Sequence, residues 1–401
     1  MNNKKNIKIK RSKGRLYKKR RSPARTAIET IVLVVLAGGL IYVGYTAAGP
    51  LISYIQSGGS SGTVTSWTPD ESGVGGSENN GSEPSSADTS LEITTQPREA
   101  SSIGTYLIPR NALKSKDSLN SALDSAKNSG FGIVLIPLKD DSGAILYKSQ
   151  IDYIANVKEL VTGTLSAKDI ADAVKAKGLV PKAVIPTLLD KISPDYVNDT
   201  GYYFADSPDI SWYDKAPDNG GKRWVDPYRA GTKKYYSDMV KELKTAGFEE
   251  IALSELRYPD LHDSDEPRLG SKFFTADRYK GLSELYQGCY NASDKKAAVS
   301  VNIKDVLDGK GQSFYRTAEI LTDKSFSGKI FLTVNLADFG ETLELAQGNP
   351  LTLPKDAAKK AEALIGKASE YIGTNVTVVP VINGVGMSME DLVKCYKEIT
   401  P

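Results

Sequence analysis

Seven short runs of β-branched and aliphatic residues recur between residues 105 and 382, and stretches of helical pattern separate them. Each run is almost continuously apolar, as expected of a strand that is covered on both faces. Parallel strands joined by helices build either a (β/α)8 barrel or a doubly wound sheet. The predicted strands are residues 105–109, 132–138, 179–186, 250–256, 297–303, 329–336 and 375–382.

The segment that contains the first run and the residues after it favours the barrel. It reads GTYLIPRNALKSKDS and contains no GxGxxG phosphate loop of the kind that opens a doubly wound sheet. Seven strands leave one barrel position unfilled, so either a strand lies within the long stretch 187–248 or the barrel lacks its final unit. The predicted fold class is therefore α/β, a TIM-like (β/α) barrel over residues 101–401, incomplete under the second alternative.

Three helical segments carry signals for where they begin or end. Gly130 follows SLNSALDSAKNS and Gly247 follows TKKYYSDMVKELKTA, and a glycine at such a position ends a helix. The segment SMEDLVKCYKEI begins at Ser388, and Asp391 three residues later can complete a capping box. These signals predict helices between and after the strands.

The first hundred residues differ from the rest in composition. Residues 1–26 hold twelve Lys and Arg and no acidic residue, and residues 27–55 contain the apolar run TIVLVVLAGGLIYVGYTAAG. Twenty residues at a rise of about 1.5 Å span the hydrocarbon core of a bilayer. Residues 56–100 are rich in Gly and Ser and too poor in large apolar residues to bury a core. We predict a basic cytoplasmic tail, one transmembrane helix and a disordered linker before the barrel.

The basic tail sets the expected orientation. By the positive-inside rule, the N-terminus is cytoplasmic and the C-terminal domain is extracellular, so the protein is a single-pass protein of the cell membrane that contacts the lipid bilayer through residues 27–55. A cleaved signal peptide, with small residues at Thr46 and Ala48, is the alternative. Without the twelve basic residues of the tail, the rest of the chain has a net charge of −10, which argues against nucleic acid as a partner.

The sequence offers no metal or cofactor motif. The only histidine is His262, and no CxxC or HExxH spacing occurs. Cys289 and Cys395 are too few for a disulfide framework, although they could pair with each other. We expect no cofactor.

Three successive late strands end in asparagine. These residues are Asn302, Asn335 and Asn383, and in barrels of this kind functional groups gather where strands end. An amide both donates and accepts hydrogen bonds, which suits sugar hydroxyls. The alternative is that each asparagine caps a helix or shapes a turn.

Three segments carry a resemblance to a known family. They are LIPLKDDSGAILY (135–147), WVDPY (224–228) and FEEIALSELRYP (248–259). In this order and spacing, over roughly residues 103–390, they resemble a bacterial family classed with the glycoside hydrolases and related to alpha-amylase-type barrels. The pattern of that family includes KDDSG, a WVDPY-like turn, EIxFDYxRFP and a later VSxDVFG strand. The resemblance implies a carbohydrate partner, such as a polysaccharide or the glycan of the cell wall.

Two expected acids are replaced in this chain. The family's aspartate of EIxFDYxRFP falls on Ser254, and that of VSxDVFG falls on Asn302. In amylase-type barrels, carboxylates on these strands serve as nucleophile and acid, and glycoside hydrolysis normally needs two acidic side chains. The resemblance therefore predicts a hydrolase-like scaffold with degenerate catalysis, a pseudoenzyme.

The remaining acids leave an active enzyme as an alternative. Strand alternation predicts that Glu255 points at the helix layer and pairs with Arg257. The DDSG segment predicts a turn in which Asp140 or Asp141 bonds its own backbone, and Asp226 is expected to order a loop. A displaced catalytic pair would join Glu255 to Asp141 or Asp226.

The sequence thus predicts a membrane-anchored, extracellular protein of the bacterial cell envelope that interacts with carbohydrate. An active glycosidase and a non-catalytic envelope assembly module are the alternatives. Trp224 and Tyr228 either stack on sugar faces or pack within loops. The predicted substrate-binding residues are Asp140, Trp224, Tyr228, Ser254, Arg257, Asn302, Asn335 and Asn383.

Overall fold

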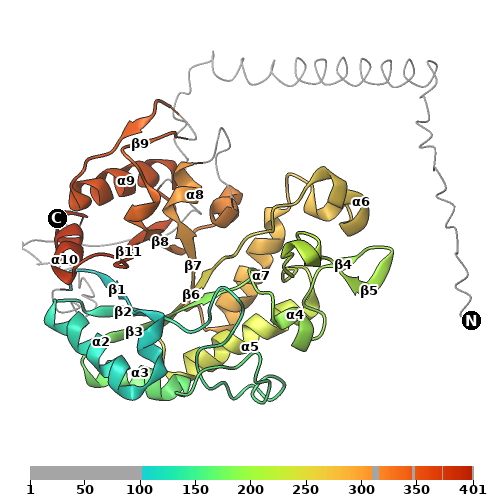
Figure 1. Ribbon diagram of the computed structural model, residues 1–401, viewed down its shortest axis with the longest axis horizontal. Helices are drawn as coiled ribbons and strands as arrows, with labels where there is room; N and C mark the ends of the chain where they lie inside the picture. The colour runs from blue at the N-terminus through green and yellow to red at the C-terminus, as the bar shows by residue number, and fades with distance from the viewer. Residues whose placement is uncertain (1–101, 309–315, 346–347, 373, 400–401) are drawn as a thin grey trace, which may run out of the picture. The chain divides into compact units, whose positions relative to one another are not determined.

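Seven parallel strands form a nearly closed barrel in the computed structural model (Figure 1). The structure describes residues 102–308, 316–345, 348–372 and 374–399, all within the unit Glu92–Pro401. The strands pair in the order β1-β2-β3-β6-β7-β8-β11, and each coincides with a predicted run. They are β1 (Thr105–Leu107), β2 (Ile133–Pro137), β3 (Val180–Pro186), β6 (Glu250–Ser254), β7 (Ala297–Asn302), β8 (Lys329–Val334) and β11 (Thr377–Ile382).

Helices lie around the outside of these strands (Figure 1). The predicted end signals are confirmed: Gly247 has a φ of 105° directly after α5, and Ser388 Oγ accepts a hydrogen bond from the Asp391 N–H at the start of α10. The helices are α2 (Lys116–Asn128), α3 (Ala167–Ala176), α4 (Ser193–Tyr196), α5 (Ala230–Ala246), α6 (Glu266–Leu269), α7 (Tyr279–Ala292), α8 (Ile303–Leu307), α9 (Ala357–Ile372) and α10 (Met389–Ile399). Short 3-10 turns cover Arg110–Lys114, Pro217–Asn219, Asp263–Asp265, Ser271–Phe273, Arg316–Thr322 and Leu336–Asp338.

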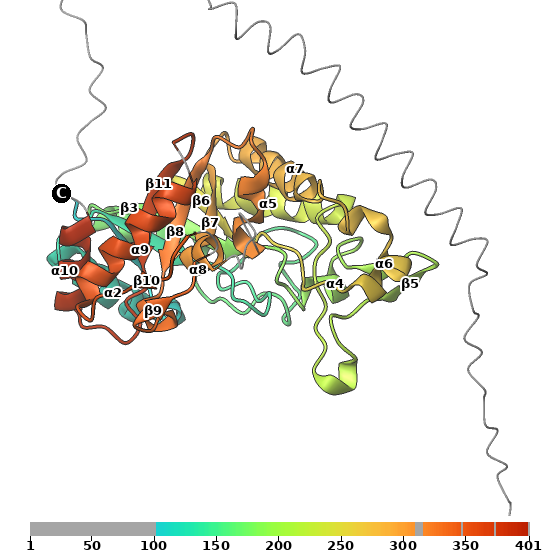
Figure 2. The same ribbon diagram turned by 90° about the horizontal axis from the view of Figure 1, so that it is seen from above.

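The stretch 187–248 contributes no strand to the barrel. Its strands β4 (Tyr203–Phe204) and β5 (Ser207–Ser211) pair only with each other, antiparallel, and lie with α4 and α6 to one side of the barrel (Figure 2). A second small antiparallel pair, β9 (Thr342–Leu343) and β10 (Leu351–Thr352), is also separate from the barrel sheet. Within the described ranges the barrel therefore lacks an eighth strand, as the second alternative predicts.

A tyrosine bridges the seam that the missing strand leaves. β1 and β11 lie in contact, but no ladder hydrogen bond joins them among the described residues. Tyr396 of α10 is buried, and its hydroxyl donates to Thr105 O of β1 at 2.5 Å and accepts from Ile382 N of β11 at 2.9 Å. One side-chain hydroxyl thus satisfies a backbone group on each side of the opening.

The barrel encloses a small apolar core of its own. Successive side chains of a strand point to opposite faces, so alternate residues fill the inside while the others pack against the helices. The inner cluster is fully buried and separate from the larger core beneath the helices. Its members are Leu135, Ala252, Ala298, Phe331 and Val381.

Further predictions concern the first hundred residues and the two cysteines. The basic tail 1–26, the transmembrane segment 27–55 and the linker 56–100 lie outside the described residues. Of the helices that are described, none has the length and apolar character needed to cross a bilayer. Cys289 and Cys395 are both buried and free rather than paired, and burial raises the pKa of the Cys289 thiol to about 12.

Candidate functional site

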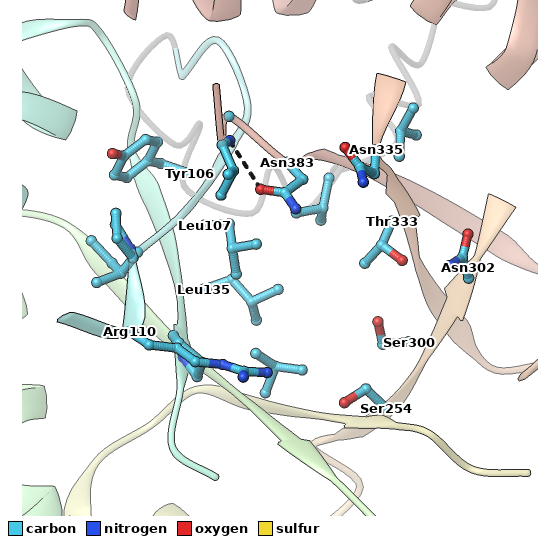
Figure 3. A pocket seen from close by; sticks show the side chains of 18 of the residues that line it. Tyr106, Leu107, Arg110, Leu135, Ser254, Ser300, Asn302, Thr333, Asn335 and Asn383 are labelled. Atoms are coloured by element: carbon cyan, nitrogen blue, oxygen red, sulfur yellow. Dashed lines mark hydrogen bonds between the residues drawn. The ribbon is translucent and has the colours of Figure 1, made fainter. Parts of the chain in front are cut away.

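A cavity of about 820 Å³ opens at the C-terminal ends of the barrel strands. Its floor is the top of the inner core, since Leu107, Leu135, Val184 and Val381 belong to or pack against that core and also line the cavity. In (β/α) barrels, active sites generally lie at this end of the strands. Figure 3 shows the strand ends converging on this space.

Strand alternation determines which side chains reach the cavity. The inner core contains Ala252 of β6, Ala298 of β7 and Phe331 of β8. The residues two positions further along these strands carry hydroxyl groups and line the cavity: Ser254, Ser300 and Thr333. A further two residues along β7 and β8 come Asn302 and Asn335, which line it as well. The ends of β6, β7 and β8 therefore present one layer of hydroxyls and, above it, amides (Figure 3).

The asparagines also shape the local backbone, as the alternative interpretation predicts. Asn302 Oδ1 caps α8 by accepting from Lys304 N at 2.9 Å, and Asn383 Oδ1 accepts from Val385 N at 3.1 Å. Asn335 Nδ2 donates to Asp338 Oδ1 at 2.8 Å. No hydrogen bond links the Nδ2 groups of Asn302 and Asn383 to another described residue, so both can donate to a ligand.

Glu255 departs from the regular strand on which the alternation prediction depends. Its φ of +49° breaks the extended conformation directly after β6, and the residue is one of those that line the cavity with Ser254. The predicted partner is confirmed: Arg257 Nε donates to Glu255 Oε2 at 2.6 Å. Arg257 itself does not line the cavity but lies over the Trp224 ring, 4.8 Å from its centroid.

The other two acids that line the cavity also have partners. Asp141 Oδ1 accepts from Arg110 at 2.8 Å, and Arg110 lines the cavity too. Asp338 accepts from Asn335, as described above. Each acidic side chain in this lining, Asp141, Glu255 and Asp338, is thus held by a neighbouring cation or amide.

The DDSG turn behaves as predicted for Asp140. Asp140 Oδ1 accepts from Ser142 N, Ser142 Oγ and Ala144 N at 2.8, 2.6 and 3.0 Å. Partial burial by itself would raise the pKa of Asp140, but these hydrogen bonds outweigh it and lower that pKa below its ordinary value. Asp140 does not line the main cavity, whereas its neighbour Asp141 does.

A buried ion pair holds the KDDSG motif (139–143) in place. Lys139 is fully buried, and its Nζ donates to Asp190 Oδ2, Tyr236 Oη and Pro186 O at 2.6, 2.8 and 3.1 Å. Gly143 has a φ of +103°, and a Cβ added there would lie 1.9 Å from Asp190 Oδ1. Lysine and glycine in KDDSG therefore both serve the packing around Asp190.

The WVDPY segment lies away from the cavity. Asp226 is 2 % exposed, accepts from Tyr228 N at 2.9 Å and has Lys272 Nζ 3.7 Å away. Burial raises the pKa of Asp226 against the opposing charge of Lys272. Trp224 Nε1 donates to Asp214 at 3.1 Å, and Tyr228 Oη donates to Arg278 O at 3.1 Å. These three residues pack within loops and do not line the cavity.

The structure thus brings six of the predicted residues together and leaves five outside the lining. Asp141, Ser254, Glu255, Asn302, Asn335 and Asn383 line the cavity, while Asp140, Trp224, Asp226, Tyr228 and Arg257 do not. Sequence reasoning missed Ser300 and Thr333, although each stands two residues before a singled-out asparagine on the same strand. In the part of the chain that the structure describes, no group of three or more His, Cys, Asp or Glu is placed to hold a metal ion.

Solved structures similar to this chain have low sequence identity to it. A hypothetical protein from Ruminiclostridium thermocellum ATCC 27405 is 16 % identical, with a TM-score of 0.39, over 49 % of this chain and 96 % of the other. The pneumococcal virulence factor StrH is 11 % identical, with a TM-score of 0.43, over 75 % and 83 %. The GH20 exo-beta-N-acetylglucosaminidase from Vibrio harveyi is 11 % identical, with a TM-score of 0.42, over 76 % and 55 %. No curated protein matches the chain.

A family model covers the part of the barrel that carries these motifs. It matches residues 104–307, just over half of the chain, from β1 to the end of α8. Lys139, Ser254, Glu255 and Asn302 all lie within the match. The chain therefore belongs to the family described as "Putative glycosyl hydrolase domain" and is a glycoside-hydrolase-like protein.

Proposed function

We propose that this protein binds a polysaccharide or a cell-wall glycan in the barrel cavity and has lost ordinary two-carboxylate hydrolysis. The observation that carries the proposal is the lining at the ends of β6 and β7, where Ser254, Ser300 and Asn302 stand. Hydroxyl and amide groups both donate and accept hydrogen bonds, as sugar hydroxyls do. They cannot protonate a leaving group or form a glycosyl ester. The site is therefore suited to binding.

The correspondence with the family supports the loss of catalysis. Ser254 and Asn302 take the places of the family's two aspartates in the sequence pattern, and the relation to alpha-amylase-type barrels is part of the proposal. Both residues face the cavity, so their replacement changes the chemistry of the site itself. The cavity acids Asp141 and Glu255 are each paired with an arginine.

An active glycosidase is the second candidate, because the two acidic residues Glu255 and Asp141 line the same cavity. A retaining enzyme needs two carboxyl groups about 5–5.5 Å apart, and an inverting enzyme needs about 6.5–9.5 Å. Both side chains would first have to leave their arginine partners, and for this reason we place binding ahead of hydrolysis.

The cellular setting that we propose rests on the sequence. Residues 27–55 would anchor the chain in the cell membrane with residues 1–26 in the cytoplasm, and residues 56–100 would link the anchor to an extracellular barrel. This arrangement would present the cavity to glycans of the cell envelope. No nucleic acid or cofactor enters the proposal.

Blocking the cavity tests the binding function. On a glycan array, we expect the full chain to bind at least one glycan, and Ser254→Phe to bind it at least roughly tenfold more weakly, because the ring occupies space that the ligand needs. Ser264→Phe is the matched control, since Ser264 is exposed in the 3-10 turn Asp263–Asp265 and does not line the cavity.

The outcomes separate the candidate functions. Equal binding by the Ser254→Phe and Ser264→Phe variants would place the glycan elsewhere on the protein. Failure of the full chain to bind any glycan would contradict the proposal and favour an envelope assembly module.

A further inference from the structure

The cavity lining is polar along β6 to β8 and mainly apolar along β11 and the start of α10. The β6 to β8 side contributes hydroxyl, amide and carboxyl groups, and Val334 is its only apolar member among the described residues. The adjoining wall follows β11, which pairs with β8, into the start of α10. Beside Asn383 and Ser388, this wall contributes the aliphatic and thioether side chains of Val381, Val385, Met387, Met389 and Leu392.

This apolar wall is open to solvent at its outer end. Val385 is 76 % exposed, which makes it the most exposed large hydrophobic residue among those described. Met387 and Met389 are partly exposed, whereas Leu392 is buried. Val385, Met387 and Met389 thus give the cavity an apolar surface that a ligand can cover, and Met387 and Met389 also pack against the main core.

The position of the wall follows from the incomplete barrel. A complete barrel would continue from β11 to another strand before returning to β1, but here the chain turns at Asn383 and enters α10. The methionines therefore lie beside the seam between β11 and β1. Methionine side chains are flexible and adapt to irregular apolar ligands, and the wall is aliphatic rather than aromatic.

We propose that the ligand is a saccharide that carries an aliphatic chain, with the sugar on the polar side and the chain along Val385, Met387 and Met389. Because one continuous cavity contains both surfaces, a single amphipathic molecule can cover both. This inference rests on the proposed function, since it assigns the sugar to the hydroxyl and amide groups of β6 to β8.

Alkyl glycosides of increasing chain length test the inference. The full chain in phospholipid nanodiscs is titrated calorimetrically with methyl, butyl and hexyl β-glycosides of glucose, galactose and N-acetylglucosamine, and the heat of empty nanodiscs is subtracted. For at least one sugar, we expect the hexyl glycoside to bind roughly tenfold or more tightly than the methyl glycoside, because each buried methylene is worth about 0.8 kcal/mol.

Substitutions locate the chain-length effect on the wall. Val385→Ser combined with Met389→Ser should bring the affinity for the hexyl glycoside close to that for the methyl glycoside, each measured on the same variant. Ile210→Ser is the matched control, since Ile210 is 55 % exposed on β5 and does not line the cavity. Melting temperatures of the variants establish that they fold.

Each contrary outcome has a distinct meaning. Equal affinity for all chain lengths would overturn the inference and leave glycan binding intact. Hexanol binding as tightly as the hexyl glycosides would also overturn the inference, because the polar side chains of β6 to β8 would then contribute nothing to the affinity. If no alkyl glycoside binds although the glycan array is positive, the inference fails alone, whereas a negative array removes the proposed function.

Discussion

Replacing Lys139 by methionine is expected to lower the free energy of unfolding by about 3–5 kcal/mol, the range for breaking a buried ion pair. Lys139 and Asp190 are both completely buried, and their charged atoms lie 2.6 Å apart. The substitution leaves the Asp190 carboxylate without its cation in a site of low dielectric. Burial lowers the pKa of Lys139, while Asp190 opposes that shift.

A double-mutant cycle separates this pairing from loss of packing. In the unmodified chain, Asp190 Oδ1 accepts hydrogen bonds from Ile192 N at 2.9 Å and from Ser193 N at 2.8 Å. Asp190→Asn retains a carbonyl oxygen that can accept these bonds. The Lys139→Met/Asp190→Asn double variant should therefore lose clearly less stability than the sum of the two single variants. Urea unfolding of the full chain, followed by circular dichroism, measures all four proteins. Strict additivity would show that the two charges are not coupled.

Removing the hydroxyl of Tyr396 should cost about 2–4 kcal/mol of stability. Tyr396→Phe leaves Thr105 O and Ile382 N without their shared partner, and each buried unsatisfied group costs about 1–3 kcal/mol. Because these groups lie on the two strands that border the seam, we also expect faster hydrogen exchange of the Ile382 amide than in the unmodified chain.

The control for this substitution is another tyrosine hydroxyl. Tyr196 is 42 % exposed and makes no hydroxyl hydrogen bond within the described ranges, so Tyr196→Phe should change stability by less than about 0.5 kcal/mol. Thermal melts compare the two variants with the unmodified chain. An equal effect of both substitutions would contradict the bridging role of Tyr396.

The barrel strands were predictable because burial on both faces leaves a continuous apolar run in the sequence. The same alternation that fills the inner core also places Ser254, Asn302 and Asn335 toward the cavity. It predicts Ser300 and Thr333 equally well, but hydroxyl residues inside a strand give no distinctive pattern. The sequence did not decide whether the barrel has an eighth strand, since the stretch 187–248 is long enough to hold one.

Other features depend on backbone conformation or on distant contacts. Glu255 leaves the extended conformation of β6 through a positive φ, which a non-glycine residue rarely adopts and which the sequence does not signal. The WVDPY motif marks a packed loop because Asp226 binds the Tyr228 amide and lies near Lys272, a residue remote in sequence. The apolar wall brings together residues of β11 and α10 that are unremarkable in a linear pattern.

The most direct test of the account is whether a bound glycan stays intact. A glycan selected on the array is incubated with the full chain and with Glu255→Gln, and mass spectrometry and a reducing-end assay then follow its size. We predict that the glycan is recovered uncleaved from both proteins. Sustained release of reducing ends by the unmodified chain, abolished by Glu255→Gln, would contradict the loss of catalysis.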